Sequence, residues 1–208
     1  MSNARSRSSM VEVAADPLTA FTAFTDELDL WWVRGPINAY DSGRLVEMRC
    51  ESGVGGRILE VYDTDTGEGL ELARITVWEP GRRLAWNSSL DDVTIDVRFD
   101  PTATGTIVRL EATVSEGGED RGGSSFVAMT PPWFGAWMGR RDSAPREAQD
   151  LARMALTLYY ARPAAAARWL ADAFGFESPN ALPEGEDPLS DDKYGFPWIE
   201  FTWATPRS

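Results

Sequence analysis

The sequence predicts an α+β fold, in which a curved antiparallel sheet surrounds a long C-terminal helix and a small βαβ appendage follows. Three observations predict it. Apolar and polar residues alternate in six segments between residues 45 and 114, which is the period of half-buried strands. Short turns rich in Gly, Asp and Pro join these segments, and such connections permit only antiparallel neighbours. Before and after the strands, apolar residues recur at helical spacing.

The N-terminal part should supply one strand and one short helix. Residues 1–9 contain no apolar run and are expected to form a disordered tail, whereas Met10–Ala15 is typical of a strand. Asp16 and Pro17 then provide an N-cap and a first-turn proline, so a helix should begin there. Its buried face should consist of the apolar residues at helical spacing, Leu18, Phe21, Phe24 and Leu28.

Six strands are expected in the middle of the chain. The alternation is clearest between Val93 and Phe99, where valine, isoleucine and phenylalanine share one parity. The sheet should be a meander with one face that needs a cover, and the C-terminal helix is the natural cover. The expected strands are Leu45–Glu51, Gly56–Tyr62, Leu70–Trp78, Arg83–Ser88, Val93–Phe99 and Thr106–Val114.

The covering helix is expected after a Gly-rich acidic loop, Glu116–Ser125. Thr130 and the two prolines after it should open this helix, and Arg146–Arg153 should continue it beyond Pro145. A curved sheet closed by a helix often leaves an interior cleft, which is a common place for ligands, and the loop could gate it. The side chains presented to the sheet would be Trp133, Phe134, Trp137 and Met138.

Composition excludes several classes of function. The 208 residues contain no histidine, which removes Ser-His-Asp and Cys-His nucleophiles and His-based metal sites. A net charge of −13 argues against nucleic acids and anionic membranes as partners. Cys50 is the single cysteine and no apolar stretch is long enough to span a membrane, so we expect a soluble, cytoplasmic protein. A single lysine and Ala-rich segments suggest a GC-rich, actinobacterial genome.

Three segments carry a resemblance to a known superfamily: Gly55–Glu60, Ile75–Trp86 with its Glu-Pro-Gly-Arg-Arg-Leu-Ala-Trp turn, and Gly105–Glu111. They resemble the START-like (SRPBCC) superfamily and, within it, the subgroup named for the activator of Hsp90 ATPase (AHSA1-like). The resemblance covers about Met10–Ala155, and we place this domain at residues 10–153. It implies a helix-grip fold around a cavity that often holds apolar or amphipathic ligands, and it supplies no catalytic residue.

Residues 154–208 resemble the first part of a glyoxalase-like (vicinal oxygen chelate) module. In that family two such modules surround a metal ion held by His and Glu ligands. The first ligand position falls near Tyr159 or Tyr160 in this chain, which has no histidine, so we expect no metal. We expect a packing appendage or a homodimerisation element. The elements that carry the resemblance are a strand at Leu156–Ala161, a helix from Pro163, its C-cap Gly175 and a strand at Pro197–Trp203.

Candidate ligand contacts are mostly indoles. Each indole offers a large apolar face and one N–H donor. Two near the tight turn, Trp78 and Trp86, are expected to be structural. For those on the helices that would line the cleft, ligand contact and plain packing both remain open; they are Trp31, Trp32, Trp133 and Trp137.

Two charged residues in strands, Glu60 and Arg74, are further candidates. Most strand charges should form ion pairs on the solvated face. If either residue points inward, it needs partners and would mark a polar anchor for a ligand.

Three hypotheses for function follow. We favour non-catalytic binding of a small hydrophobic or aromatic molecule in a Trp-lined cavity between the sheet and the C-terminal helix, because reactive side chains are few. The first alternative is a chaperone-interacting, Hsp90-activator-like protein. The second is a cyclase- or hydrolase-like enzyme that uses cavity carboxylates, although no spacing singles out a pair. We expect no cofactor and assign no catalytic residue.

Overall fold

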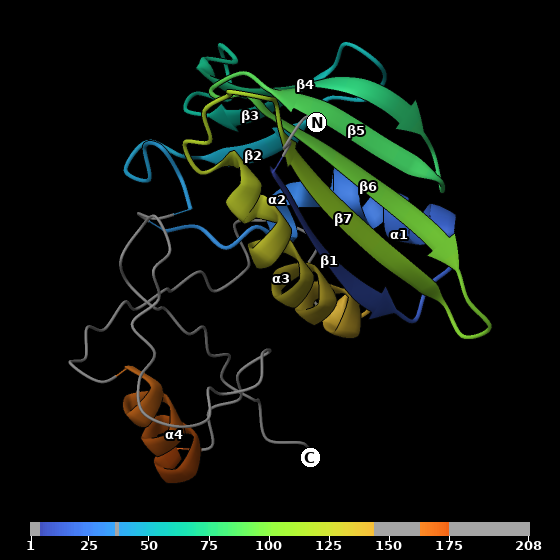
Figure 1. The fold of residues 1–208 in the computed structure, drawn as a ribbon, viewed down its shortest axis with the longest axis vertical. Helices are drawn as coiled ribbons and strands as arrows, with labels where there is room; N and C mark the ends of the chain where they lie inside the picture. The colour runs from blue at the N-terminus through green and yellow to red at the C-terminus, as the bar shows by residue number, and fades with distance from the viewer. Residues whose placement is uncertain (1–4, 36–37, 144–162, 175–208) are drawn as a thin grey trace. The chain divides into compact units, whose positions relative to one another are not determined.

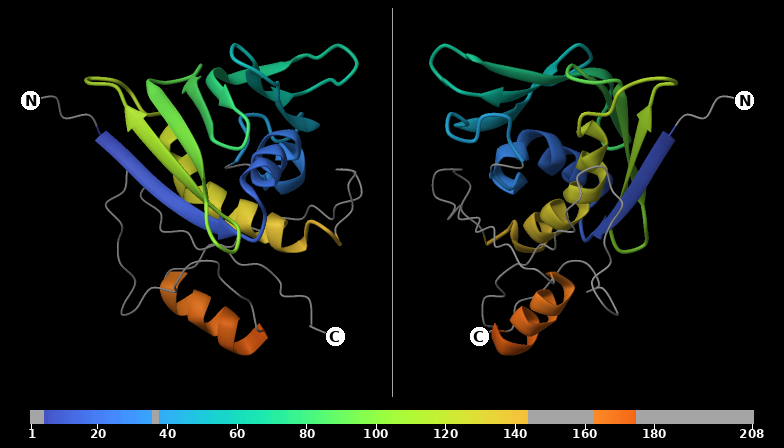
Figure 2. Two further views of the ribbon diagram at one scale, coloured as in Figure 1. Left: turned by 90° about the vertical axis from the view of Figure 1, so that its right-hand side faces the viewer. Right: turned by 60° about the vertical axis from the view of Figure 1, so that its left-hand side comes forward.

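A computed structural model describes residues 5–35, 38–143 and 163–174. The chain divides into two compact units, Met1–Ala155 and Leu156–Ser208. The first unit has the predicted α+β architecture, with a curved antiparallel sheet of seven strands (Figure 1). Three helices lie on the concave side of this sheet (Figure 2). They are α1 (Pro17–Asp26), α2 (Leu28–Trp31) and α3 (Phe126–Arg140).

The sheet contains the predicted meander, since β2 to β7 each pair with the next strand along the chain. Every one of these six strands begins and ends within two residues of its predicted bounds. The turn chemistry explains this accuracy: at Gly81 the backbone adopts φ of +72°, a conformation that side chains other than glycine rarely permit. The strands are β2 (Glu47–Cys50), β3 (Arg57–Val61), β4 (Gly69–Glu79), β5 (Arg83–Ser88), β6 (Val93–Pro101) and β7 (Thr106–Val114).

The first strand, β1 (Arg5–Val13), begins earlier than predicted and pairs with β7 along its whole length. The prediction of a disordered tail is therefore wrong for Arg5–Ser9. These residues are polar and almost all exposed, so no apolar pattern indicates a strand. Backbone hydrogen bonds to Leu110–Val114 hold them instead, and a backbone ladder does not depend on the side chains.

Helix α1 begins where the sequence predicts it. One carboxylate oxygen of Asp16 accepts hydrogen bonds from the backbone N–H groups of Leu18 and Thr19, both at 3.0 Å, and Pro17 is the first helical residue. Three of the four predicted apolar positions, Phe21, Phe24 and Leu28, are buried, while Leu18 is exposed.

Helix α3 begins at Phe126, one turn before the predicted start at Thr130, and it contains Pro131 and Pro132. Proline has no N–H, so the helix lacks two backbone hydrogen bonds at this point. The Thr130 hydroxyl donates to the carbonyl oxygen of Phe126 at 2.7 Å. The early start matters for the site, because it places Phe126 and Val127 against the core. The predicted continuation, Arg146–Arg153, lies outside the described residues.

Within the second unit, the structure describes one helix, α4 (Pro163–Phe174), which matches the predicted helix. The rings of Trp169 and Phe174 meet edge to face at 5.3 Å on it, and both side chains are exposed. The predicted strands Leu156–Ala161 and Pro197–Trp203 lie outside the described residues. Among the described helices of both units, none is long and apolar enough to cross a membrane.

The two faces of the sheet carry different chemistry. Alternate residues of β5, β6 and β7, such as Trp86, Ile95 and Leu110, point to the concave side and join the core. The opposite parity carries arginines that pair with carboxylates, for example Arg83 with Asp96. By this alternation, six arginines of β2 to β7 lie on the convex face; they are Arg49, Arg57, Arg74, Arg83, Arg98 and Arg109.

Candidate functional site

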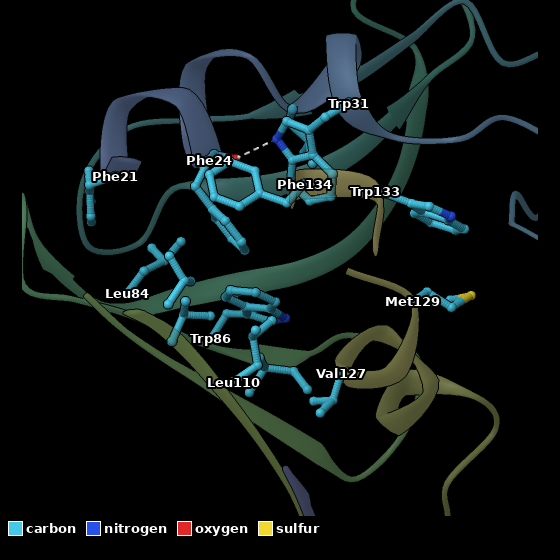
Figure 3. Close-up of a cluster of buried hydrophobic side chains, with 14 of the residues drawn as sticks. Phe21, Phe24, Trp31, Leu84, Trp86, Leu110, Val127, Met129, Trp133 and Phe134 are labelled. Atoms are coloured by element: carbon cyan, nitrogen blue, oxygen red, sulfur yellow. Dashed lines mark hydrogen bonds between the residues drawn. The ribbon is translucent and has the colours of Figure 1, made fainter. Parts of the chain in front are cut away.

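Two of the predicted indoles are enclosed by the protein's own side chains. Trp31 is 2% exposed, its Nε1–H donates to the carbonyl oxygen of Phe24 at 3.2 Å, and its ring packs against Phe134 at 5.6 Å (Figure 3). Trp137 is completely buried, and its Nε1–H donates to Glu27 at 2.7 Å. Of the two roles left open by the sequence, packing rather than ligand contact therefore describes Trp31 and Trp137.

Glu27 connects the helices around this enclosed region. The Arg141 guanidinium donates to both of its carboxylate oxygens, at 2.6 and 2.8 Å, in addition to the bond from Trp137. The hydrogen bond to Glu27 raises the pKa of Arg141 above its ordinary value. Because Glu27 lies between α1 and α2 and Arg141 follows α3, this group fixes the end of α3 against the N-terminal helices.

The other two helix indoles belong to a different group, which we call the aromatic stack: Trp32, Phe126 and Trp133. The rings of Trp32 and Phe126 stack with centroids 5.8 Å apart and an angle of 20° between their planes. Trp133 meets Trp32 edge to face at 5.2 Å. The Trp32 Nε1–H donates to the carbonyl oxygen of Asn38 at 2.9 Å, which fixes the ring. Trp133 is 5% exposed, but Trp32 and Phe126 are only half-buried.

Half-buried apolar side chains also lie on the concave face of the nearby strands. Cys50 of β2 and Ile58 of β3 face each other in the register, and both pack against the core together with Leu72 of β4. Helix α2, which directly precedes Trp32, packs against β2 and α3. We call the end of the concave face formed by Cys50, Ile58, Leu72 and the aromatic stack the open end.

Phe126 is a site residue that sequence reasoning missed. Its ring contacts Trp86 of β5 edge to face at 5.1 Å, in addition to its stacking on Trp32. It therefore joins the sheet to the aromatic stack. The signal that could have found it is the phenylalanine four residues before Thr130, but the double proline suggested a later helix start.

Glu60 points toward the concave side and is 1% exposed. The sequence left this inward orientation open, and such an orientation requires partners for the carboxylate. Its carboxylate accepts hydrogen bonds from the backbone N–H groups of Tyr40 at 2.8 Å and Asp41 at 3.3 Å, and from the Tyr62 hydroxyl at 3.0 Å. These donors fasten the segment that leads from α2 to β2. Burial, together with the hydrogen bond to Glu60, raises the pKa of Tyr62 to about 12.

Arg74 lies on the convex face, so the structure does not bring it together with the other predicted site residues. Its guanidinium donates to Glu71 at 2.5 Å and to the carbonyl oxygen of Gly55 at 3.1 Å, and the side chain is exposed. A β-bulge explains the difference. Ile58 faces Ala73 while Leu59 faces Glu71, so Leu72 is an extra residue that reverses the parity before Arg74.

The Gly-rich acidic loop, 116–125, is fastened to the turn between β5 and β6. Asp91 accepts hydrogen bonds from the backbone N–H groups of Arg121 and Gly123, at 2.9 and 3.0 Å. Asp92 accepts one from Glu119 at 2.8 Å. These acceptors fix the chain just before α3 and so help to position Phe126.

Among the described residues, no group of His, Cys, Asp and Glu could hold a metal ion.

The class that this arrangement defines is an α+β helix-grip fold, with an antiparallel sheet curved around a covering helix. No family model matches the chain, and no curated protein matches it. Similar solved structures include an AHSA1-like protein from Aeromonas hydrophila, at 16% identity over 66% of this chain and 94% of that one, with a TM-score of 0.47. The Aha1 dimer from Colwellia psychrerythraea is 17% identical over 62% and 90%, with a TM-score of 0.42. A protein of unknown function from Enterococcus faecalis is 13% identical over 74% and 78%, with a TM-score of 0.48.

Proposed function

We propose that this protein binds a small hydrophobic or aromatic molecule at the open end, without performing chemistry on it. The single observation that carries the proposal is the half-buried aromatic stack. Trp32 and Phe126 are held rigidly by packing and by the hydrogen bond to Asn38, yet each keeps part of its surface in contact with water. Rigid aromatic faces with residual exposure are the feature that a flat apolar ligand recognises at low entropic cost.

The free energy available from burying apolar surface supports this proposal. Removing apolar surface from water contributes about 25 cal/mol for each Å² buried. A ligand of naphthalene size that covers roughly 150 Å² of apolar surface on the protein and a similar area of its own would gain about 7 kcal/mol before ordering costs. After those costs, this corresponds to dissociation constants of about 10 μM to 1 mM.

Nothing on the described surface favours the two alternatives over binding. The Hsp90-activator-like role and the cyclase- or hydrolase-like role remain predictions from the sequence. The inward carboxylate, Glu60, is occupied by three donors from the protein itself, which suits a structural anchor better than an acid or base. Homodimerisation through residues 154–208 likewise remains a proposal.

Calorimetric titration with naphthalene derivatives tests the proposal. Saturable binding is expected to the unaltered protein and to Trp169→Leu, which removes an exposed indole of α4 in the other unit. Trp32→Leu should weaken binding about tenfold, because it removes one face of the aromatic stack. Circular dichroism of both variants checks that the fold is retained.

Two outcomes would contradict the proposal. One is the absence of saturable binding to the unaltered protein for every aromatic probe. The other is equal loss of affinity in Trp32→Leu and Trp169→Leu, since that would place the ligand away from the aromatic stack.

A further inference from the structure

Trp86 presents a buried donor that the protein does not use. The side chain is 5% exposed and lies on the concave face of β5, where its ring meets Phe126 edge to face. Among the described residues, no acceptor takes its Nε1–H. This contrasts with Trp31, Trp32 and Trp137, whose indole N–H groups all donate to oxygen atoms of the protein.

The nitrogen of Trp86 also keeps some access to solvent. The fully enclosed and unpaired side-chain atoms of the described residues are Arg34 Nε, Asn38 Oδ1 and Asp91 Oδ1, and the Trp86 nitrogen is not among them. In Figure 3 it lies at the end of the ring on the side of Val127, which belongs to α3. Water can therefore satisfy this donor in the free protein, and a ligand that displaces the water needs an oxygen in its place, because a buried polar group left without a partner costs free energy.

The next side chain on the same face of β5, Ser88, does not serve Trp86 as an acceptor. Its hydroxyl oxygen accepts instead from the backbone N–H groups of Leu90 and Asp91, both at 3.2 Å. The ring of Phe126, which lies against the indole, offers no oxygen. The indole that carries this free donor is in contact with Phe126, which already belongs to the proposed binding site.

The surrounding charge selects the kind of acceptor. All six arginines of β2 to β7 lie on the convex face by strand parity, and the inward strand side chain described above is the carboxyl group of Glu60. A ligand carboxylate on the concave face of these strands would lose its hydration without gaining an arginine from the strands themselves, which is unfavourable. A neutral oxygen incurs a much smaller desolvation cost.

We propose that the open end takes an uncharged aromatic or apolar molecule that carries a carbonyl oxygen, and that the Nε1–H of Trp86 donates a hydrogen bond to this oxygen. The inference rests on the proposed binding function and adds the polar requirement that defines the ligand class. It also changes the role of Trp86 from a purely structural residue to one that determines specificity.

A matched pair of probes tests this inference. In 2-isopropenylnaphthalene a CH₂ group replaces the carbonyl oxygen of 2-acetylnaphthalene at nearly the same shape, and 2-naphthoate adds the charged acceptor. Calorimetry gives the three affinities for the unaltered protein and for a variant with 3-benzothienylalanine at position 86, which keeps the bicyclic ring and lacks the N–H. In a ¹⁵N-labelled sample, the indole signal of Trp86 is identified by its absence in this variant.

Three results are expected. The ratio of ketone to alkene affinity should fall about tenfold in the variant, because the ketone oxygen then stays unpaired in the site. The Trp86 indole proton should move downfield with the ketone and not with the alkene. The naphthoate should bind more weakly than the ketone to the unaltered protein.

The result that overturns the inference is distinguishable from failure of the proposed function. If the alkene and the ketone both bind, and the ratio of their affinities is unchanged in the variant, the site is apolar and Trp86 is structural. If the naphthoate binds more tightly than the ketone, the charge argument is wrong. If neither neutral probe binds, the proposed function fails and the inference fails with it.

Discussion

The concave face of the sheet differs between its two ends. At the end formed by β6 and β7, which we call the sealed end, the inward residues are almost completely buried, with Val97 and Val108 at 0% and Ile95 at 2% exposure. At the open end, Cys50 and Ile58 have the same inward parity but are half-buried. Helices α1 and α3 both contact β7, whereas α2, which directly precedes Trp32, contacts β2; all three lie on the concave side (Figure 2). Inward-facing residues of the same sheet are thus buried in the core at one end, where they stabilise the fold, and keep part of their surface exposed at the other.

The largest effect on stability should follow from the loss of Trp137, which lies in the enclosed part of the molecule. Trp137→Ala removes a completely buried indole and the donor to Glu27, so we expect a loss of about 3–5 kcal/mol in the free energy of unfolding. Trp169→Ala, at an exposed position, should change it by less than about 0.5 kcal/mol. Urea unfolding followed by circular dichroism measures both. A loss below about 1 kcal/mol for Trp137→Ala would show that this enclosed indole does not stabilise the fold.

A matched pair of isoleucines tests the comparison directly. Ile95→Ala, at the sealed end, should cost about 3 kcal/mol of unfolding free energy because it leaves a cavity. Ile58→Ala, at the open end, should cost about 1 kcal/mol, because part of this side chain already contacts water. The same urea titration compares them. Equal losses would mean that the two ends are packed alike.

Cys50 reports on the chemistry of the open end. Burial, as the main cause, raises the pKa of its thiol to about 12, so very little thiolate exists at pH 8. We expect its reaction with Ellman's reagent at pH 8 to be at least about a hundredfold slower than after unfolding in urea. Because Cys50 is the only cysteine, the absorbance change has one source. Equal rates in the two states would show that burial does not raise the pKa of the Cys50 thiol.

A smaller effect is expected at high pH. The folded-state pKa of Tyr62 is raised to about 12 from an ordinary value of 10.0, so the folded protein holds this proton longer than the unfolded chain. The stabilisation is fully present below about pH 10 and is lost between about pH 10 and 12. Urea midpoints should therefore fall across this window, and less steeply in Tyr62→Phe. Tyr40→Phe, at an exposed tyrosine, should retain the steep fall; a curve unchanged in Tyr62→Phe contradicts the assignment.

The sequence predicted the meander closely because each strand ends at strong turn chemistry, as at Gly81, and each has an inward apolar parity. It missed the start of β1, since Arg5–Ser9 are held by a backbone ladder that leaves no side-chain pattern. It also placed the start of α3 too late, because Pro131 and Pro132 normally mark a helix beginning. Local signals were sufficient where turns and periodicity determine structure, and insufficient where pairing between distant segments does.

The candidate site was less predictable than the fold. The sequence left open whether Glu60 and Arg74 point inward; in the structure Glu60 does, and a one-residue bulge at Leu72 turns Arg74 to the convex face. Without knowing how α2 and α3 pack, the sequence could not show that Trp31, Trp133 and Trp137 are buried while Trp32 is only half-buried. Phe126 and the free donor of Trp86 emerge only from the contacts between α3 and β5.

The pairing of β1 with β7 also affects how the protein is made. During synthesis β1 leaves the ribosome before its partner, Thr106–Val114, which is about a hundred residues further along the chain. At roughly 5–20 residues per second, the strand waits for about 5–20 seconds without its neighbour. Its polar N-terminal half, Arg5–Ser9, protects it during that interval, because charged and hydroxyl side chains on an unpaired strand discourage association with other nascent chains.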